Sequence, residues 1–351
     1  MTASGGTTIP VQRRDDGPFR LSVIVPMFNE EGSADAFFDA VLPVAAGLTP
    51  DFEILCVDDG SRDDTAARVR ARIAREPRIG LIRFSRNFGK EAALTAALDH
   101  CEGDAVVSID ADLQMRPEVI ADMVAKWREG WDVVAATRAD RATDSGLRAF
   151  FSRRFYHTFN RIADTPIPPE TGDFRLLDRG VVLALRQLPE RTRFMKGLFA
   201  WVGFTTTTIE YDHGERHAGT SSFKLWKLWN FALDGITSFS TFPLRVWSYV
   251  GFATALLAFV YGSWIVLRTL IFGSDVPGYA SLLVFILFLG GIQLISLGVL
   301  GEYVGRLLIE TKRRPIYLAR SAELPARAGH GPAVERAAGP ADGAELKEDG
   351  S

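Results

Sequence analysis

The chain has 351 residues, of which 47% are apolar and 24% are charged. These proportions are typical of a globular protein and exclude a wholly disordered chain, a collagen and a disulfide-rich miniprotein. Lysine and arginine number 40 against 43 aspartates and glutamates, a net charge of −3, so no basic field exists to hold nucleic acid. Cys56 and Cys101 predict two reduced structural thiols rather than a disulfide or a metal pair.

The first 20 residues form a polar extension without the apolar segment of a signal peptide, so we expect the following chain to stay in the compartment of its synthesis. Short β-rich runs then alternate with helix-like stretches. The runs span residues 21–25, 53–57, 80–84, 105–109 and 132–136, and the helix-like stretches span residues 33–48, 63–75, 90–101 and 117–129. This alternation predicts an α/β fold, a parallel sheet with helices on both faces.

Polar residues gather where the predicted strands end, which is where parallel α/β sheets bind their ligands. Asp110 and Asp112, with Gln114 two residues further on, follow the fourth strand. Alternate residues of an extended chain face the same side, so the three would offer oxygen atoms to one cation. Mg²⁺ or Mn²⁺ prefers such ligands and shares them with substrate phosphates. Neither GxGxxG nor the P-loop pattern GxxxxGKS/T occurs, so both standard phosphate loops are missing.

Two long runs without charge, residues 246–267 and 276–301, follow the α/β part. Roughly 20 apolar residues span a bilayer as a helix, so the pair predicts a transmembrane hairpin rather than two buried soluble helices. Lysine and arginine flank the pair, whereas the connecting loop holds one arginine, and the positive-inside rule then places both ends in the cytoplasm. Residues 321–351 lack aromatic side chains and predict a disordered cytoplasmic tail.

The stretch before the first span carries Phe223, Trp226, Trp229 and Leu233 at helical spacing, with lysines beside them. Tryptophan and lysine near a span are typical of helices that lie in the membrane interface. Residues 216–245 are therefore predicted to form interfacial helices, with an ordinary amphipathic core helix as the alternative.

Five motifs occur in an order that resembles family-2 glycosyltransferases: VIVPMFNEE, CVDDGS, FSRNFGKEAAL, DADLQ and TGDFRLLDR. With the hairpin, the chain is most similar to the polyprenyl-phosphate type, which includes bactoprenol-phosphate glucosyltransferases and dolichol-phosphate mannose synthase. The resemblance covers roughly residues 21–315. It implies a Rossmann-like GT-A domain that transfers a sugar, with inversion, from a nucleotide-diphosphate sugar such as a UDP-hexose to undecaprenyl phosphate. It also implies a multi-pass protein of the inner membrane with its catalytic domain in the cytoplasm.

The expected domains follow from these features. They are a polar extension (1–20), a GT-A catalytic domain (21–215), interfacial helices (216–245), two transmembrane helices (246–305) and a basic segment with a disordered tail (306–351). A homo-oligomer and a flippase are further candidate partners.

The resemblance also implies roles for single residues, each with a turn, a surface arginine or a structural ion pair as the alternative. The residues expected to contact the donor nucleotide sugar are Pro26, Phe28, Asn29, Glu30, Asp58, Asp59, Asp110, Ala111, Arg138 and Arg216. The metal site falls to Asp110, Asp112 and Gln114. The acceptor phosphate falls to Arg153, Arg154 and Lys224, with Arg216 as a further candidate, and the catalytic positions to Asp173 and Arg175.

The acceptor would be a phosphate monoester, whose second pKa is about 6. At pH 7 it is mostly a dianion and already nucleophilic, so a strong general base is less necessary than for a sugar hydroxyl. We therefore expect Asp173 to orient Arg175 and the sugar rather than to remove a proton.

Two departures from the family pattern change charge near the predicted site. Met115 and Arg116 follow DADLQ, where related sequences often have an acidic residue, and Ser222 stands where they often have a lysine. Two other functions stay open. A processive polysaccharide synthase usually carries QxxRW, which does not occur here. A membrane-anchored scaffold that binds a nucleotide sugar without turnover would not need the acidic motifs.

Overall fold

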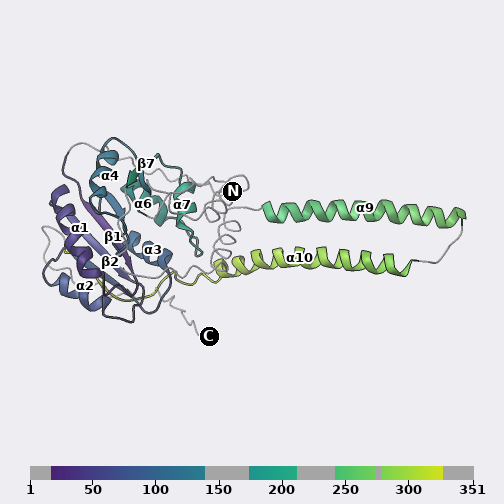
Figure 1. Cartoon of the computed structure of the whole chain (residues 1–351), viewed down its shortest axis with the longest axis horizontal. Coiled ribbons are helices and arrows are strands. Elements are labelled where there is room, and N and C mark those ends of the chain that lie inside the picture. The colour runs from purple at the N-terminus through teal and green to yellow at the C-terminus, as the bar shows by residue number, and fades with distance from the viewer. Residues whose placement is uncertain (1–16, 139–173, 212–241, 273–277, 327–351) are drawn as a thin grey trace, which may run out of the picture.

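The computed structural model describes residues 17–138, 174–211, 242–272 and 278–326. Within these ranges, the chain forms an eight-stranded sheet in the order β7-β5-β6-β4-β1-β2-β3-β8, from which two long helices extend (Figure 1). The strands are β1 (Leu21–Met27), β2 (Phe52–Asp58), β3 (Ile79–Phe84), β4 (Ala105–Ser108), β5 (Val133–Arg138), β6 (Arg175–Asp178), β7 (Thr206–Tyr211) and β8 (Ala319–Glu323).

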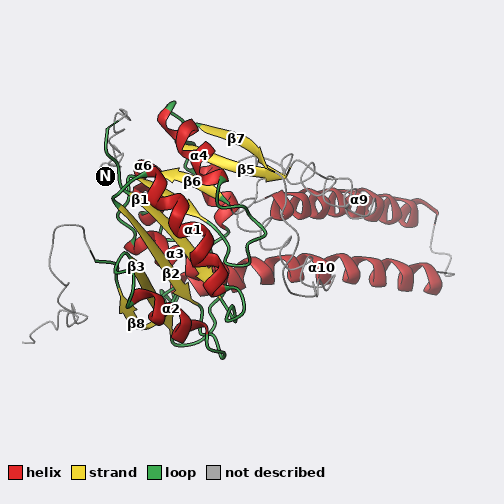
Figure 2. Cartoon of the chain, turned by 60° about the vertical axis from the view of Figure 1, so that its left-hand side comes forward, coloured by secondary structure: helices red, strands yellow, loops and turns green. Residues whose placement is uncertain are grey.

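Helices cover both faces of the sheet (Figure 2). One face packs against α1 (Ala34–Leu48), α2 (Thr65–Ile73) and α4 (Val119–Arg128), and the other against α3 (Lys90–His100), α6 (Arg179–Arg186) and α7 (Met195–Trp201). Successive side chains of a strand point to opposite faces. Val23 and Val25 of β1 accordingly join the first core and Ile24 joins the second. The central strands are therefore apolar along their whole length.

The structure confirms the predicted α/β class, a Rossmann-like GT-A domain followed by two long apolar helices. All five predicted strands and all four predicted helices are present within about two residues of the expected bounds. The sheet is mixed, however, and not parallel throughout, because β6 runs antiparallel to β4 and β5 and β8 runs antiparallel to β3. Both cysteines are buried free thiols, as expected.

The C-terminal segment corrects one expectation. The sequence predicts a disordered tail over residues 321–351, yet its first residues belong to β8, which pairs with β3 at the sheet edge, and the described chain continues to Ala326. Residues 327–351 lie outside the described residues, and for them the prediction stays open. The prediction used composition, which tests whether a segment can build a core of its own. An edge strand needs only the unpaired backbone groups of an existing sheet, and a polar segment such as ARSAE meets that need.

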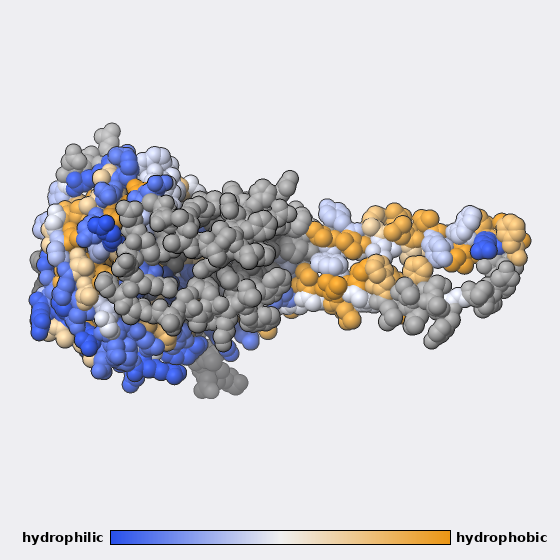
Figure 3. Space-filling model, in the orientation of Figure 1, coloured by the Kyte–Doolittle hydropathy of each residue, from blue (hydrophilic) through white to orange (hydrophobic). Residues whose placement is uncertain are grey.

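Two long helices, α9 (Phe242–Phe272) and α10 (Tyr279–Thr311), run side by side away from the sheet. Their stretches Val246–Phe272 and Phe288–Thr311 are long and apolar enough to cross a membrane. Large apolar side chains of these helices, such as Phe259, Leu270 and Leu294, are 74%, 79% and 72% exposed. The two helices form a largely apolar surface beside a more polar domain (Figure 3). Such exposure does not fit a soluble core and indicates membrane association. The predicted interfacial helices fall largely on residues 212–241, outside the described residues.

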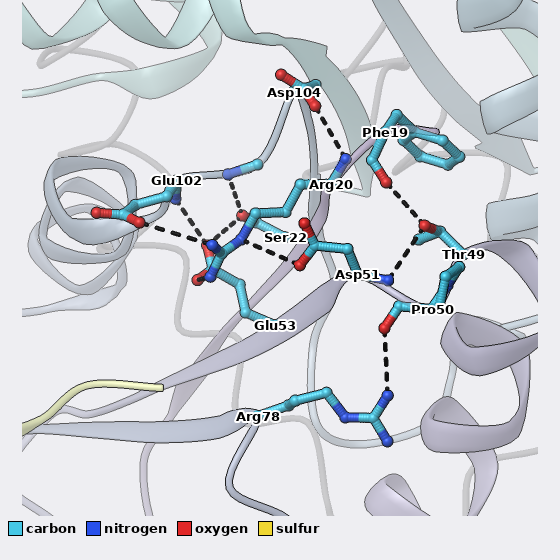
Figure 4. A network of polar contacts seen from close by, with 11 residues as sticks. Phe19, Arg20, Ser22, Thr49, Pro50, Asp51, Glu53, Arg78, Glu102 and Asp104 are labelled. Atoms are coloured by element: carbon cyan, nitrogen blue, oxygen red, sulfur yellow. Dashed lines mark hydrogen bonds and ion pairs between the residues drawn. The ribbon is translucent and has the colours of Figure 1, made fainter. Parts of the chain in front are cut away.

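A buried carboxylate holds the amino ends of β1, β2 and β4 together (Figure 4). Glu53 is 3% exposed and accepts hydrogen bonds from the Ser22 hydroxyl (2.5 Å), the Arg20 guanidinium (2.7 Å) and the Glu102 backbone N–H (2.7 Å). Buried charges persist in proteins when they are paired and hydrogen-bonded in this way. This network lies at the sheet edge opposite the carboxyl ends of β1 and β2, and its role is structural.

Candidate functional site

A cavity of 320 Å³ lies at the carboxyl ends of β1 and β4, the edge at which sheets of this class bind ligands. It brings together residues from four motifs that are far apart in the sequence. Its lining consists of Pro26, Met27, Phe28, Glu30, Asp59, Asn87, Gly89, Lys90, Ala93, Asp110, Ala111 and Asp112. Seven of the predicted site residues are among them, so the structure places these seven around one cavity.

The turn after β1 is fixed by hydrogen bonds to the turn after β2. Asn29 has a φ of 57°, a left-handed conformation that asparagine tolerates better than most residues. Its backbone N–H donates to the Ser61 hydroxyl (2.9 Å), and its side-chain oxygen accepts from the Arg62 N–H (3.0 Å). The Glu30 N–H donates to the Thr65 hydroxyl (2.8 Å). With the backbone held in this way, Phe28 stays 43% exposed at the cavity.

The acidic pair after β2 shapes the loops around the cavity. Asp58 is fully buried, accepts from the Ser61 N–H (2.8 Å) and lies 3.1 Å from Nε of Arg83. Asp59 borders the cavity and accepts from the N–H groups of Phe88 (2.6 Å) and Gly89 (2.9 Å). Burial raises the pKa of Asp59, and these two backbone hydrogen bonds oppose that rise. Both carboxylates thus have structural partners, and their contacts with base and ribose stay predictions.

The DADLQ motif forms a tight turn directly after β4. Asp112 accepts from the backbone N–H of Gln114 (3.2 Å) and from its side-chain Nε2 (2.7 Å), and Leu113 between them has a φ of 57°. Non-glycine residues in this region cost free energy and cluster at functional sites. Gln114 therefore holds the Asp112 carboxylate in place, while its own role as a metal ligand stays a prediction.

Negative charge accumulates on one side of the cavity. The pKa of Glu30 is raised, first by burial and then by the charges of Asp112 and Asp110, while a hydrogen bond from the Ser33 hydroxyl opposes the rise. Several negative charges close together mark a place where a cation is favoured. Within the described ranges, no three His, Cys, Asp or Glu side chains form a ready-made metal site. A cation held here would need further ligands from a substrate.

Lys90 is a site residue that the sequence reasoning did not single out. It is the first residue of α3, and its ammonium group lies 2.8 Å and 2.9 Å from the two carboxylate oxygens of Asp110. Gly89 before it has a φ of 98°, a conformation that glycine adopts without strain. The available signal was its place in FSRNFGKEAAL, at the carboxyl end of a predicted strand. Lys90 puts a positive charge beside the acidic motif, and an ammonium group suits a phosphate oxygen.

The resemblance noted in the sequence implies a nucleotide-sugar donor. For such a donor we expect Lys90→Gln to lower kcat/KM by about tenfold to a hundredfold, because a charge-assisted contact with a phosphate is worth roughly 1.5–3 kcal/mol. Steady-state kinetics across donor concentrations measure the effect. Lys126→Gln is the matched control, since Lys126 pairs with Glu129 (2.8 Å) on the exposed surface of α4. Equal kinetics for Lys90→Gln and the unaltered chain would remove Lys90 from the site.

The remaining predicted residues fall in different places. Arg175 begins β6, is 4% exposed and lies over the Phe199 ring at 4.1 Å, so it packs between the sheet and α7 and is not among the residues that line the cavity. Arg138 ends β5, where its backbone pairs with Tyr211 of β7. The predicted residues outside the described ranges are Arg153, Arg154, Asp173, Arg216 and Lys224.

Comparison with known proteins identifies similar sequences over most of the chain. The family model for glycosyl transferase family 2 matches residues 22–185, and the model for the GtrB C-terminal hairpin matches residues 242–307. An uncharacterized glycosyltransferase of Synechocystis is 52% identical over 85% of this chain and 94% of its own length. A prophage bactoprenol glucosyl transferase homolog of Escherichia coli is 49% identical, covering 86% and 98%. A prophage-derived bactoprenol glucosyl transferase of Shigella flexneri is 50% identical, covering 86% and 97%.

Proposed function

The chain belongs to glycosyl transferase family 2, and from this premise we propose that it transfers a hexose from a nucleotide-diphosphate sugar to a polyprenyl phosphate. One observation carries the proposal: an acidic cavity at the strand ends and an exposed apolar hairpin occur in the same chain. The cavity suits a nucleotide diphosphate, and the hairpin suits an acceptor that resides in lipid. Two relatives with 49% and 50% sequence identity are named as a homolog of a bactoprenol glucosyl transferase and as a bactoprenol glucosyl transferase. These names support a glucosyl donor and a bactoprenol acceptor.

The donor would bind with its diphosphate between Lys90 and the DADLQ turn. Asp110 and Asp112 border the cavity together, and their charges already raise the pKa of Glu30, so the residues present fit a divalent cation. Mg²⁺ or Mn²⁺ held by these two carboxylates would act as a Lewis acid on the leaving diphosphate. Lys90 would pair with a phosphate oxygen, and the exposed ring of Phe28 would lie against the nucleoside.

The acceptor phosphate would attack the anomeric carbon from the face opposite the leaving group, which inverts its configuration. The C–O bond to the diphosphate breaks as the new C–O bond forms, and a dianionic acceptor has no proton to lose. Binding therefore requires cations to hold the dianion in line with the sugar. Arg153, Arg154, Arg216 and Lys224 are the proposed cations, and Asp173 is the proposed orienting group beside Arg175.

A donor screen tests the proposal. The full chain in detergent would receive undecaprenyl phosphate, Mn²⁺ and one of several radiolabelled donors, including UDP-glucose, UDP-galactose and GDP-mannose. We expect one donor to transfer label into the lipid extract, with UDP-glucose the first choice. Label in water-soluble polymer would favour a processive synthase. Donor binding without transfer to any lipid would favour a non-catalytic scaffold, and both results would contradict the proposal.

The proposed topology places the catalytic domain and the C-terminus in the cytoplasm and the loop between α9 and α10 outside. A protease-cleavable tag after Ser351 should be cut only in inverted vesicles, because lysine and arginine concentrate at the ends of the hairpin near the domain. A tag inserted in the loop of residues 273–277 should be cut only in intact spheroplasts. Cleavage of the C-terminal tag from outside would contradict the topology.

Asp173→Asn should remove most of the activity, since the amide keeps the shape of the side chain and loses the charge that would orient Arg175. Because the acceptor needs no strong base, the residual rate should gain no new dependence on pH between about pH 7 and 9. Initial rates across this range measure both effects. A residual rate that climbs steeply with pH would indicate proton transfer by Asp173, and an unchanged rate would exclude the residue from the mechanism.

A further inference from the structure

A second cavity adjoins the acidic one. It measures 420 Å³ and shares Phe28 and Asn87 with the first cavity. Its lining includes Arg62, Arg83, Arg86 and Arg320 and, among the described residues, no carboxylate. Three of the four arginines come from the loops that follow β2 and β3 or from the end of β3. Arg320 comes from β8, beyond the membrane hairpin.

The pairing of β8 with β3 changes register at Arg320. Ser321 lies opposite Arg83, and Ala319 lies opposite Phe84. Arg320 is thus the extra residue of a β-bulge, and bulges beside functional sites redirect side chains out of the regular alternation. The bulge accounts for an edge-strand arginine that lines the cavity.

Contacts on both sides of the bulge hold β8 in place. The Tyr317 ring stacks on Phe84 at 5.1 Å, and its hydroxyl donates to Asp99 (3.1 Å). Arg70 of α2 pairs with Glu323 at 2.8 Å. At Gly80, a Cβ atom would lie 2.4 Å from the Pro325 ring, so the chain after β8 packs directly on the β3 backbone. Arg320 is therefore presented from a fixed strand.

The end of α10 is attached to the same domain. The Glu310 carboxylate accepts from the backbone N–H groups of Arg191 and Thr192, each at 3.0 Å, and the Arg191 guanidinium donates to the Arg314 carbonyl (3.0 Å). The chain from α10 to β8 thus connects the membrane hairpin to the wall of the basic cavity.

Two of the other three arginines, Arg83 and Arg86, have partners that leave less capacity for a ligand, whereas Arg62 lines the cavity from the turn after β2. Arg83 lies against Asp58, and Arg86 stacks on Phe88 at 4.0 Å while it donates to the Asn87 carbonyl (3.0 Å). Among the residues that the structure describes, Arg320 has neither an ion pair nor a side-chain hydrogen bond. Its guanidinium fork suits an anionic or acceptor-rich group.

We propose that Arg320 binds the nucleotide part of the donor, so that the segment beyond the membrane hairpin completes the nucleotide site. This inference rests on the proposed function. The two adjoining cavities suit the two parts of a nucleoside diphosphate. Its phosphates suit Lys90 and the proposed cation site of the acidic cavity. Its remaining hydrogen-bond acceptors suit the arginines of the basic cavity.

Calorimetric titration of the full chain in detergent with UDP and Mn²⁺ tests the inference. Arg320→Ala should weaken UDP binding by about tenfold to a hundredfold, the range expected for a lost charged hydrogen bond. Arg320→Lys should recover part of the loss, since it keeps the charge without the fork. Arg68→Ala is the matched control: Arg68 lies on the same helix as Arg70 but pairs with Asp35 of α1 (2.8 Å), away from β8 and the cavity, so this variant should leave binding unchanged.

Titrations with UMP and uridine locate the contact. A loss that persists with uridine assigns Arg320 to the base or ribose, and a loss confined to UDP and UMP assigns it to a phosphate; either result supports the proposal. Unchanged UDP binding by Arg320→Ala, or an equal loss in Arg68→Ala, overturns it while the proposed function stands. Absence of binding by the unaltered chain to both UDP and GDP would instead overturn the proposed function itself.

Discussion

Replacing Asp112 with alanine is expected to lower kcat by at least about a thousandfold, because a cation bound to this carboxylate would supply several kcal/mol of charge stabilisation to the leaving diphosphate. The only hydrogen bonds of the Asp112 side chain with described residues join it to Gln114, so the fold should persist. Single-turnover rates with saturating donor measure the loss directly. Excess EDTA should abolish the activity of the unaltered chain, and added Mn²⁺ should restore it.

Two variants separate this effect from a general loss of charge. Asp122→Ala removes an exposed carboxylate from the first turn of α4 and should retain full activity. Gln114→Leu removes the side-chain hydrogen bond to Asp112 and keeps the backbone one, so it should reduce activity by less than Asp112→Ala does. Full activity of Asp112→Ala, or undiminished turnover in excess EDTA, would refute the cation site.

Glu53→Ala should destabilise the domain by about 3–5 kcal/mol, the usual cost of removing one partner from a buried ion pair. The substitution leaves the Arg20 guanidinium, the Ser22 hydroxyl and a backbone N–H without the acceptor that they share in Figure 4. For a domain of this size the melting temperature should fall by roughly 6–20 °C. Intrinsic tryptophan fluorescence of the detergent-solubilised chain follows the transition.

Glu102→Ala is the control for this network. Its carboxylate is 39% exposed and lies 3.7 Å from the Arg20 guanidinium, and exposed pairs contribute about 0–1 kcal/mol. The melting temperature of this variant should therefore change by no more than a few degrees. Similar melting temperatures for Glu53→Ala and Glu102→Ala would show that the buried carboxylate is not a principal stabilising group.

The core of the fold was predictable because its local signals agree with its tertiary structure. The runs that contain Ile24, Leu55 and Val107 are apolar on both faces, as central strands of a covered sheet must be, and each is followed by a helix of sufficient length. The charge-free runs of α9 and α10 are longer than a soluble core requires. In these segments propensity, pattern and burial lead to the same structure.

The two antiparallel strands were not predictable in this way. β6 consists of Arg175–Asp178 alone, and a run of four residues has no period that separates a strand from a turn. β8 has a polar sequence, and its pairing partner lies more than 200 residues away along the chain. Both strands are stabilised by pairing with the rest of the sheet, and this tertiary contribution cannot be recognised in the local sequence.

The sequence could predict which residues gather at the candidate site better than it could predict which side chains contact one another there. Strand ends predicted that Pro26, Glu30 and Asp110 would meet, and the cavity confirms that they do. The sequence could not show that Lys90 reaches Asp110, because that contact depends on how α3 packs across the sheet. The sequence also could not show that Asp58 is buried and bound by Ser61 and Arg83. Residue type alone does not distinguish a buried carboxylate from an exposed one.

Mass spectrometry of the lipid product tests the central claim most directly. The full chain would be incubated with UDP-glucose, Mn²⁺ and either undecaprenyl phosphate or undecaprenol, which lacks the phosphate. The account predicts a lipid carrying one hexose on undecaprenyl phosphate, no product with undecaprenol, and no product with Asp112→Ala. A ladder of lipids with several hexoses, or hexosylated undecaprenol, would contradict a single transfer to a polyprenyl phosphate.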